Sequence, residues 1–392
     1  MNKREFLKLS SVAIAGSMIP SLSKAGSKSS GLHSDQPILR TLGKTGLKVP
    51  VVSSGGVHVD NPNLVREVFQ SGIIHFDSAP GYQNGRVDMT LGEMFTEFGR
   101  GKFISATKVG FPVDKETGQY QSEATTQAFL DQLDESLQRQ KSEYVDILYL
   151  QSPPGKAAAM NEEMLNGLRL AKEKGKARFV GIATHSNQAE LIETGIESNF
   201  YEILLLSYNF RLEDTLKSSI ARAAESGIGI VAMKTLAGKF LDKEKTIPIN
   251  KSAALKWVLQ DENVHTAIMS IRSIDDLELY KSIMYDIRMK PEEEHDISTY
   301  KQTAGLFCHG CEECKLQCPN RLPIPDIMRA YMYAYGYSET RKAYDVLASL
   351  SIDGNPCKKC PVCSISCRNG LDVAARIKDV LRIREIPADF LT

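Results

Sequence analysis

Eight cysteines near the C-terminus form the clearest chemical pattern in this 392-residue sequence. They fall into two sets with the same C-x₂-C-x₂-C-x₃-C spacing, and no cysteine precedes the first set: Cys308, Cys311, Cys314 and Cys318, then Cys357, Cys360, Cys363 and Cys367. Zinc sites usually take two separated C-x₂-C pairs, and thiols at such tight spacing are poorly placed for disulfides within their own set. The spacing therefore favours iron–sulfur clusters, with zinc and disulfides as the alternatives.

The same spacing, with Pro319 after the first set, resembles that of bacterial ferredoxins with two [4Fe–4S] clusters. In those proteins the fourth cysteine of each run ligates the other cluster. The resemblance implies one cluster on Cys308, Cys311, Cys314 and Cys367, and another on Cys357, Cys360, Cys363 and Cys318.

A second group of reactive side chains follows two neighbouring apolar runs. "GIIHFDSAPGY" places Asp77 at the end of one run and Tyr82 just beyond it, and "KFISATK" places Lys108 at the end of the next. An ammonium group beside a phenol stabilises the phenolate and lowers its pKa, and a carboxylate holds the lysine in position. Such a trio is suited to giving a proton to a carbonyl oxygen while hydride reaches the carbon.

Eight short, apolar, mostly β-branched runs alternate with amphipathic stretches between Arg40 and about residue 290. Uninterrupted apolar runs are typical of strands buried on both faces. Eight strand–helix units predict an α/β fold, the (β/α)₈ TIM barrel, whose active site lies at the carboxyl ends of the strands. A doubly wound sheet is the alternative, but the first run is not followed by G-x-G-x-x-G.

"FDSAPGY", "TK" and "YVDILYLQSPP" resemble elements of the aldo-keto reductases, and the similarity covers roughly residues 39–285. It implies that Tyr82 is the general acid, supported by Asp77 and Lys108. Gln151 stands where the family usually has the histidine that orients the substrate carbonyl, and its amide can still donate a hydrogen bond. His185, after the fifth strand, is a candidate to replace that histidine; the alternative is a packed or solvated residue.

The resemblance also implies NAD or NADP as a cofactor. The family usually holds the carboxamide of the nicotinamide with Ser, Asn and Gln, and these places hold Ala183, Thr184 and Leu205. Tyr208 stands where an aromatic ring would stack on the nicotinamide. The remaining expected cofactor contacts lie in the phosphate-binding turn "MKTLAG" and after the last strand: Lys234, Leu236 and Gly238, then Arg272 and Ser273.

The N-terminus resembles an export signal. Residues 1–25 have a basic start, an apolar stretch too short to span a membrane and a small-residue end, which predict a signal peptide followed by a linker over 26–38. "KREFLK" resembles the twin-arginine signal, with lysine in the place of the first arginine. That route carries folded proteins, which suits a protein loaded with clusters, so we expect a periplasmic location; the alternative is cytoplasmic.

The rest of the chain is predicted to form a barrel over 39–298 and a small, mostly helical ferredoxin-like domain over 299–392. Four tyrosines in that domain are expected to serve packing: Tyr331, Tyr333, Tyr335 and Tyr337. Basic and acidic residues number 48 each, so no nucleic-acid partner is expected.

These features predict an exported oxidoreductase acting on a carbonyl, an alcohol or a polarised alkene. Its two clusters would exchange electrons with a partner protein. The alternative is an electron carrier or redox sensor in which the barrel is a binding scaffold.

Overall fold

The structure is a computed structural model that describes residues 36–56, 61–114, 117–212, 214–242, 244–303, 305–350, 352, 354, 356–360 and 362–391. The predicted signal peptide lies outside the described residues, as does most of the predicted linker. Among the described residues, no helix is long and apolar enough to cross a membrane.

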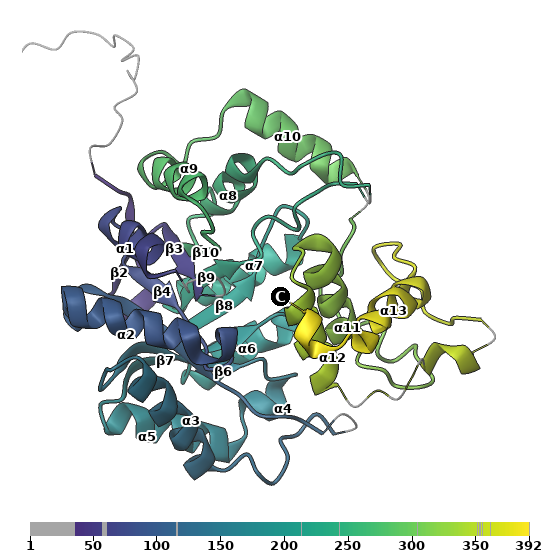
Figure 1. The fold of residues 1–392 in the computed structure, drawn as a ribbon, viewed down its shortest axis with the longest axis horizontal. Coiled ribbons are helices and arrows are strands. Elements are labelled where there is room, and N and C mark those ends of the chain that lie inside the picture. The colour runs from purple at the N-terminus through teal and green to yellow at the C-terminus, as the bar shows by residue number, and fades with distance from the viewer. Residues whose placement is uncertain are drawn as a thin grey trace, which may run out of the picture. The chain divides into compact units, whose positions relative to one another are not determined.

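Eight parallel strands close into a barrel (Figure 1) in the order β10-β3-β4-β5-β6-β7-β8-β9. The strands are β3 (Val52–Gly55), β4 (His75–Asp77), β5 (Ile104–Val109), β6 (Val145–Gln151), β7 (Ala177–Thr184), β8 (Ile203–Ser207), β9 (Gly229–Met233) and β10 (Thr266–Met269). Each corresponds to one of the eight apolar runs. The predicted (β/α)₈ barrel is confirmed, and the open doubly wound sheet is not formed.

Helices follow the strands around the barrel, and several begin at a residue whose side chain caps free backbone N–H groups. Thr125, Asn161 and Asn250 accept such hydrogen bonds at the starts of α3, α5 and α8. The helices are α1 (Pro62–Gln70), α2 (Arg86–Phe98), α3 (Thr126–Arg139), α4 (Lys156–Ala159), α5 (Glu162–Glu173), α6 (Gln188–Ser198), α7 (Asp214–Glu225), α8 (Lys251–Leu259), α9 (Ile274–Tyr285) and α10 (Pro291–Gln302).

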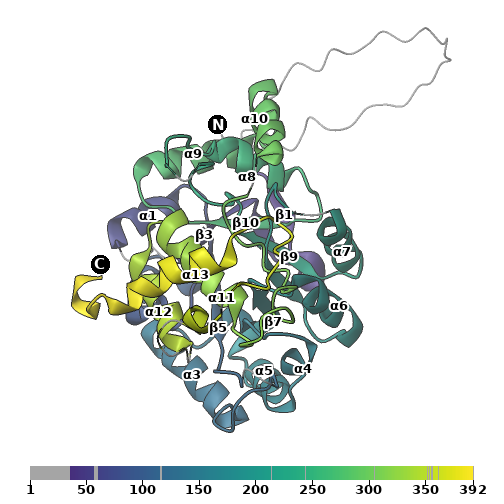
Figure 2. The same cartoon turned by 90° about the vertical axis from the view of Figure 1, so that its right-hand side faces the viewer.

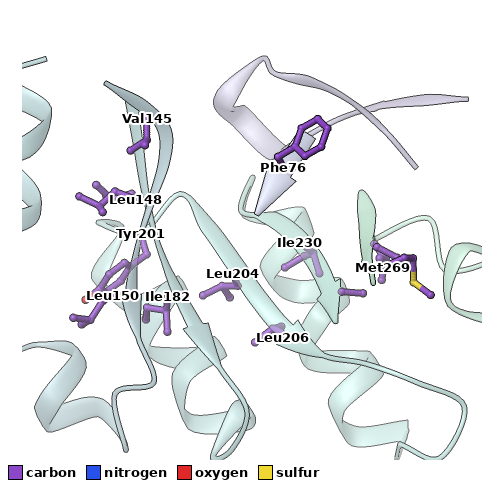
Figure 3. Close-up of a cluster of buried hydrophobic side chains, with 14 of the residues drawn as sticks. Phe76, Val145, Leu148, Leu150, Ile182, Tyr201, Leu204, Leu206, Ile230 and Met269 are labelled. Carbon is purple, nitrogen blue, oxygen red and sulfur yellow. The ribbon is translucent and has the colours of Figure 1, made fainter. Parts of the chain in front are cut away.

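Alternation along each strand explains why the apolar runs are almost uninterrupted. In β6, Leu148 and Leu150 belong to the cluster between strands and helices, part of which Figure 3 shows, whereas Ile147 and Tyr149 belong to the cluster inside the barrel. Successive strand residues point to opposite faces, and both faces of a barrel strand are buried. The interior is therefore packed, and the space for a ligand is left at the strand ends.

A short hairpin precedes the barrel. Strands β1 (Leu39–Thr41) and β2 (Lys48–Pro50) pair antiparallel, with Arg40 opposite Val49. Leu42, Leu47 and Val49 are buried with the residues inside the barrel. The hairpin thus adds apolar side chains to that core.

The C-terminal region is helical, as predicted. Its helices are α11 (Ile324–Tyr331), α12 (Thr340–Ser349) and α13 (Val373–Leu381), which share a separate apolar core containing Ile327, Leu347 and Ile377. Figure 2 shows α11 and α13 in front of the barrel strands. The described residues form one compact unit, and the predicted boundary at residues 298 and 299 falls inside α10.

The stretch from residue 324 to 350 does not form one continuous helix. A π turn, η5 (Met332–Gly336), follows α11, and Ser338 adopts a left-handed backbone with φ of 59° before α12 begins. Gly336 is required at this turn because an added Cβ would lie 2.8 Å from the ring of Phe307. This break determines which residues of the region face the barrel.

Candidate active site

Three predicted residues meet at the carboxyl ends of neighbouring strands. The ammonium of Lys108 forms a buried ion pair with Asp77 and donates a hydrogen bond of 2.7 Å to the backbone oxygen of Ser78. The same ammonium lies 4.9 Å from the ring centroid of Tyr82, which begins the 3₁₀ turn η3 (Tyr82–Gly85). The structure therefore brings Asp77, Tyr82 and Lys108 together as the sequence indicated.

The electrostatics of the trio differ from the expectation. Burial raises the pKa of Asp77 and lowers that of Lys108, and their mutual attraction opposes both shifts. Burial, followed by the charge of Asp77, raises the pKa of Tyr82 above its ordinary value. Because Lys108 is engaged by Asp77, it does not lower the pKa of the phenol. Tyr82 is thus a protonated phenol, the form that a general acid needs.

The turn that carries Tyr82 has an uncommon backbone. Gln83 and Asn84 adopt left-handed conformations with φ of 49° and 55°, and Gly85 follows with φ of 82°. Left-handed residues other than glycine cost free energy and persist only where the surrounding structure holds them. Their place beside Tyr82 indicates that the turn is held for the position of that side chain.

A cavity of about 520 Å³ opens above the trio. Asp77 and Tyr82 line it on one side, and residues of the C-terminal region line it too. Its charged lining comprises six cationic and three acidic side chains: Lys234, Lys239, Lys251, Arg272, Arg329 and Lys342, with Asp77, Asp276 and Glu339. The excess of cations favours an anionic ligand.

Gln151 and His185 also line this cavity. Burial lowers the pKa of His185 well below its ordinary value, and the cations around it, led by Lys234, add to that effect. Its Nδ1 atom is buried and has no hydrogen-bond partner among the described residues. The structure therefore places a neutral imidazole, with a nitrogen available to a ligand, beside Gln151 in the cavity.

Most of the residues predicted to contact a nucleotide lie at the cavity as well, and two do not. Lys234, Leu236, Gly238 and Arg272 line it. Ser273 instead accepts a hydrogen bond from the backbone of Asp276 and caps α9.

Tyr208 points away from the cavity, so its assignment as a ring that stacks on nicotinamide is corrected. Its ring packs 5.5 Å from that of Trp257, and its hydroxyl donates a hydrogen bond of 2.8 Å to Asp261. These contacts hold it in the apolar layer between strands and helices.

The three positions that depart from the family pattern are all buried. Ala183 and Leu205 belong to the apolar interior of the barrel, and Thr184 donates a hydrogen bond of 2.6 Å to the backbone of Ser186. None of these three side chains offers an amide to a carboxamide group. The fit to nicotinamide thus rests on the cations of the cavity, because these positions do not supply the family's usual partners.

The C-terminal region contributes side chains that the sequence did not reveal as functional: Arg329, Tyr333, Tyr337, Glu339, Lys342 and Val346 all line the cavity. Tyr333 and Tyr337 had been expected to serve packing, and a lone lysine such as Lys342 carries no motif. Glu339 forms an ion pair with Arg272 of the barrel. The cavity is therefore built by both parts of the chain.

Phe307 packs between the two parts. An added Cβ on Gly238 of the barrel, or on Gly336 of the C-terminal region, would lie 2.8 Å from the ring of Phe307. Such a separation is too short for a real Cβ contact, so both positions need glycine. Gly238, expected at a nucleotide phosphate, thus has a structural role in the packing of the C-terminal region.

The structure describes all eight cysteines, and none of them forms a disulfide. Burial, with smaller effects of Cys314, Cys311 and Cys367, raises the pKa of Cys308 to about 12. Burial likewise raises the pKa of Cys357, with smaller effects of Cys360, Cys363 and Cys318. The last cysteine of each run thus acts electrostatically on the first cysteine of the other run. Among the described residues, no group of three or more His, Cys, Asp or Glu is placed to hold a single metal ion.

The first cysteine run lies against the barrel. The backbone N–H of Asn187 donates a hydrogen bond of 3.1 Å to the oxygen of Gly310. Cys308 and Gly310 line a small hollow together with His185. His185 lines both this hollow and the main cavity, so it lies between the first thiols and the candidate active site.

Fold and site together define a (β/α)₈-barrel enzyme with a carboxylate–lysine–tyrosine group at its mouth. The aldo/keto reductase family model matches residues 59–253. The sequence is 28% identical over 274 residues to L-glyceraldehyde 3-phosphate reductase of Escherichia coli K12, covering 64% of this chain and 74% of the relative. It is 28% identical over 221 residues to L-galactose dehydrogenase of Arabidopsis thaliana, covering 53% of this chain and 67% of that relative.

Among solved structures, the fold is similar to that of an aldo-keto reductase from Bacillus halodurans in its holo form. The TM-score is 0.56 at 19% identity, and the similarity covers 70% of this chain and 99% of that one. The barrel of this chain thus has the fold of an aldo/keto reductase, and residues 59–253 are similar to that family of oxidoreductases. The family match ends at residue 253, before both cysteine runs.

Proposed function

We propose that the protein interconverts a carbonyl compound and an alcohol, or reduces a polarised alkene, in a site shared by the barrel and the C-terminal region. The observation that carries this proposal is the cavity that Tyr82 and Asp77 line together with Arg329, Tyr333 and Lys342. Tyr82 holds the proton for the substrate oxygen, and Lys108 and Asp77 keep the phenol in place. The cations of the lining favour a substrate or cofactor with an anionic group.

Eight thiols in two runs of ferredoxin-like spacing are a donor set that suits two [4Fe–4S] clusters. The electrostatic effect of Cys367 on Cys308, and of Cys318 on Cys357, supports clusters whose ligands come from both runs. When bound, the clusters would supply one-electron transfer to a partner protein. Cys308 and Gly310 lie beside His185, so the first set of thiols is next to the substrate cavity.

A nicotinamide nucleotide is the proposed hydride carrier, and Lys234, Lys239 and Arg272 are the residues that would meet its phosphates. Arg272 is already paired with Glu339 of the C-terminal region. A bound nucleotide phosphate would therefore either displace Glu339 from Arg272 or contact Arg272 together with Glu339.

The test is binding and turnover under anaerobic conditions. NADH and NADPH are titrated separately by calorimetry, and reduction of L-glyceraldehyde and L-glyceraldehyde 3-phosphate is followed for the wild type and for Tyr82→Phe. Tyr144→Phe is the matched control, because Tyr144 precedes β6 at the opposite end of the barrel, against Arg100. Turnover by the wild type and the control, and its loss in Tyr82→Phe, is the expected result. Equal turnover in all three would remove Tyr82 as the proton donor.

A second candidate function is an electron carrier or redox sensor with a barrel that binds but does not reduce. It is favoured by the apolar side chains of Ala183 and Leu205, which offer no hydrogen bond to a carboxamide. It is also favoured by Tyr208, whose ring points away from the cavity, and by Arg272, which is already paired with Glu339. Clusters that accept electrons in a protein that binds neither nucleotide would support this candidate and exclude the first.

We further propose that the protein is exported in folded form and acts in the periplasm. The support is the signal-like residues 1–25 together with clusters that are assembled in the cytoplasm. Fractionation of cells that express the full chain tests it. Recovery of the processed protein only in the cytoplasmic fraction would contradict export.

A further inference from the structure

Tyr333 lies in the cavity although it belongs to the C-terminal region. It is 3% exposed and lines the same cavity as Tyr82. It is carried by the π turn η5, and its backbone oxygen accepts a hydrogen bond of 2.8 Å from the N–H of Glu339. π turns are rare and frequently occur at functional sites. The turn therefore places Tyr333 at the barrel mouth, where Tyr337, just after the turn, also lines the cavity.

Two ammonium groups flank its ring. Lys234 lies 3.9 Å from the ring centroid of Tyr333, and Lys342 lies 4.5 Å from it. Lys234 adopts a left-handed backbone with φ of 58°, a conformation that costs free energy for any residue but glycine. The barrel thus holds Lys234 against a tyrosine that the C-terminal region supplies.

Positive charge around Tyr333 exceeds the negative charge. The negative charge of Glu339 raises the pKa of both lysines. Its carboxylate lies 3.8 Å from the ammonium of Lys342 and is also paired with Arg272. Further charged or titratable groups act on Tyr333 or share its cavity: Lys108 from β5, Asp77 from β4, Tyr82 from η3, His185 after β7, Arg329 from α11 and Tyr337 after η5. A phenolate at Tyr333 would balance part of this charge.

Tyr82 and Tyr333, two of the tyrosines that line the cavity, have pKa values shifted in opposite directions. Burial alone would raise the pKa of Tyr333, but the charges of Lys234, Lys342 and Arg329 lower it to about 8. The pKa of Tyr82, in contrast, is raised. A pair of titratable groups whose surroundings push their pKa values apart supplies an acid and a base at one site.

We propose that Tyr333 is a second proton-transfer residue of this site, which exchanges a proton with Tyr82; Lys342 lies beside both rings. In reduction, as the proposed nicotinamide would supply hydride to the carbonyl carbon, the Tyr82 O–H bond breaks, its proton bonds to the substrate oxygen, and the proton of Tyr333 restores the Tyr82 phenol. A Tyr333 phenolate remains beside the ammonium groups of Lys234 and Lys342. In alcohol oxidation the transfers run in reverse: hydride would pass to the oxidised nicotinamide, and Tyr333 is the general base that accepts the substrate proton through Tyr82. This assignment deepens the proposed function and rests on it, and it makes the C-terminal region part of the catalytic site.

The test begins with the full-length, cluster-loaded protein and needs no substrate. Tyrosinate absorbance near 295 nm is followed as the pH rises, and the spectrum of Tyr333→Phe is subtracted to remove the cluster absorbance. One tyrosine is expected to ionise with a midpoint near pH 8 in the wild type and in Tyr335→Phe. Tyr335 is the matched control because it lies on the same turn but outside the cavity.

Lys342→Met provides the second variant. Removal of one of the two ammonium groups is expected to move the Tyr333 midpoint upward by about one to two pH units. Coincident titrations of the wild type and Tyr333→Phe below about pH 9, or an unchanged midpoint in Lys342→Met, would overturn the assignment.

The pH profile of L-glyceraldehyde reduction supplies the catalytic readout. The wild-type rate is expected to fall as Tyr333 loses its proton above about pH 8, and the profile of Tyr333→Phe is expected to lack this limb. Identical profiles, with the midpoint near pH 8 still present, would overturn the role as a base. A protein that shows the shifted titration but reduces no carbonyl would refute the proposed function itself, and the base role with it.

Discussion

Paired cysteine substitutions give a sharp test of the C-terminal region, because two arrangements of the same thiols predict different iron contents. The ferredoxin-like spacing predicts that Cys308 shares a cluster with Cys367, and Cys357 with Cys318, across the two runs. A sequential arrangement would group each run by itself. Replacement of two cysteines by alanine distinguishes the two arrangements. If both cysteines ligate the same cluster, the variant loses one cluster; if they ligate different clusters, it loses both.

The expected iron content of each variant follows from the number of clusters that it loses. The wild type is expected to hold about eight iron and eight sulfide per chain, and one lost cluster removes about four of each. Cys308→Ala combined with Cys367→Ala should therefore retain about four iron. Cys308→Ala combined with Cys318→Ala should retain almost none, although both residues belong to the same run.

The assay is iron and acid-labile sulfide content of anaerobically purified protein, with electron paramagnetic resonance of the reduced state to count the remaining cluster. The single variant Cys308→Ala is the reference and should lose about half of the iron. Retention of about four iron by the Cys308/Cys318 pair, with none in the Cys308/Cys367 pair, would refute the crossed arrangement. Zinc in place of iron would refute the clusters altogether.

Three further predictions concern the barrel and the core. Tyr82→Phe should lower kcat by about 10² or more with little change in KM, as measured by steady-state kinetics, because general acid catalysis contributes about that factor. Leu347→Ala, at a fully buried position, should lower the free energy of unfolding by about 2–5 kcal/mol, whereas Leu316→Ala, at a position 98% exposed, should not lower the melting temperature measurably. His185 keeps a pKa well below its ordinary value and stays neutral as the pH falls, so His185→Gln and the wild type should share the shape of their pH–rate profiles from about pH 6 to 7.5. An inflection near pH 6.5 in the wild type alone would contradict this last prediction.

Much of the site was visible in the sequence because its residues occur at recognisable places. Asp77 and Lys108 end two strands that are themselves marked by apolar runs, and parallel strands bring their carboxyl ends to one edge. The cysteine spacing was visible for the same reason, since residues two or three apart must lie close in space. The order of residues along the chain was enough to predict that Asp77 and Lys108 lie close together and that the cysteines of each run do.

The assignment of Tyr208 failed because it depended on the direction of a side chain. Tyr208 follows β8 at a position where alignment indicated the cavity, but its hydroxyl donates a hydrogen bond to Asp261, which is distant in the sequence, and the ring points away from the cavity. Gly238 lines the cavity as expected, and the sequence did not indicate that it also leaves room for Phe307. Neither partner carries a local signal that the sequence could reveal.

The sequence by itself determined the barrel and the Asp77–Lys108–Tyr82 group, because periodic burial and the order of the strands leave a direct imprint on residue order. Tertiary structure alone decided that the C-terminal region lines the substrate cavity and that Tyr333 lies between Lys234 and Lys342. Lys234 and Tyr333 are about a hundred positions apart, and their contact depends on the packing of two cores. Neither Lys234 nor Tyr333 lies in a sequence motif that indicates their contact, which only the fold brings about.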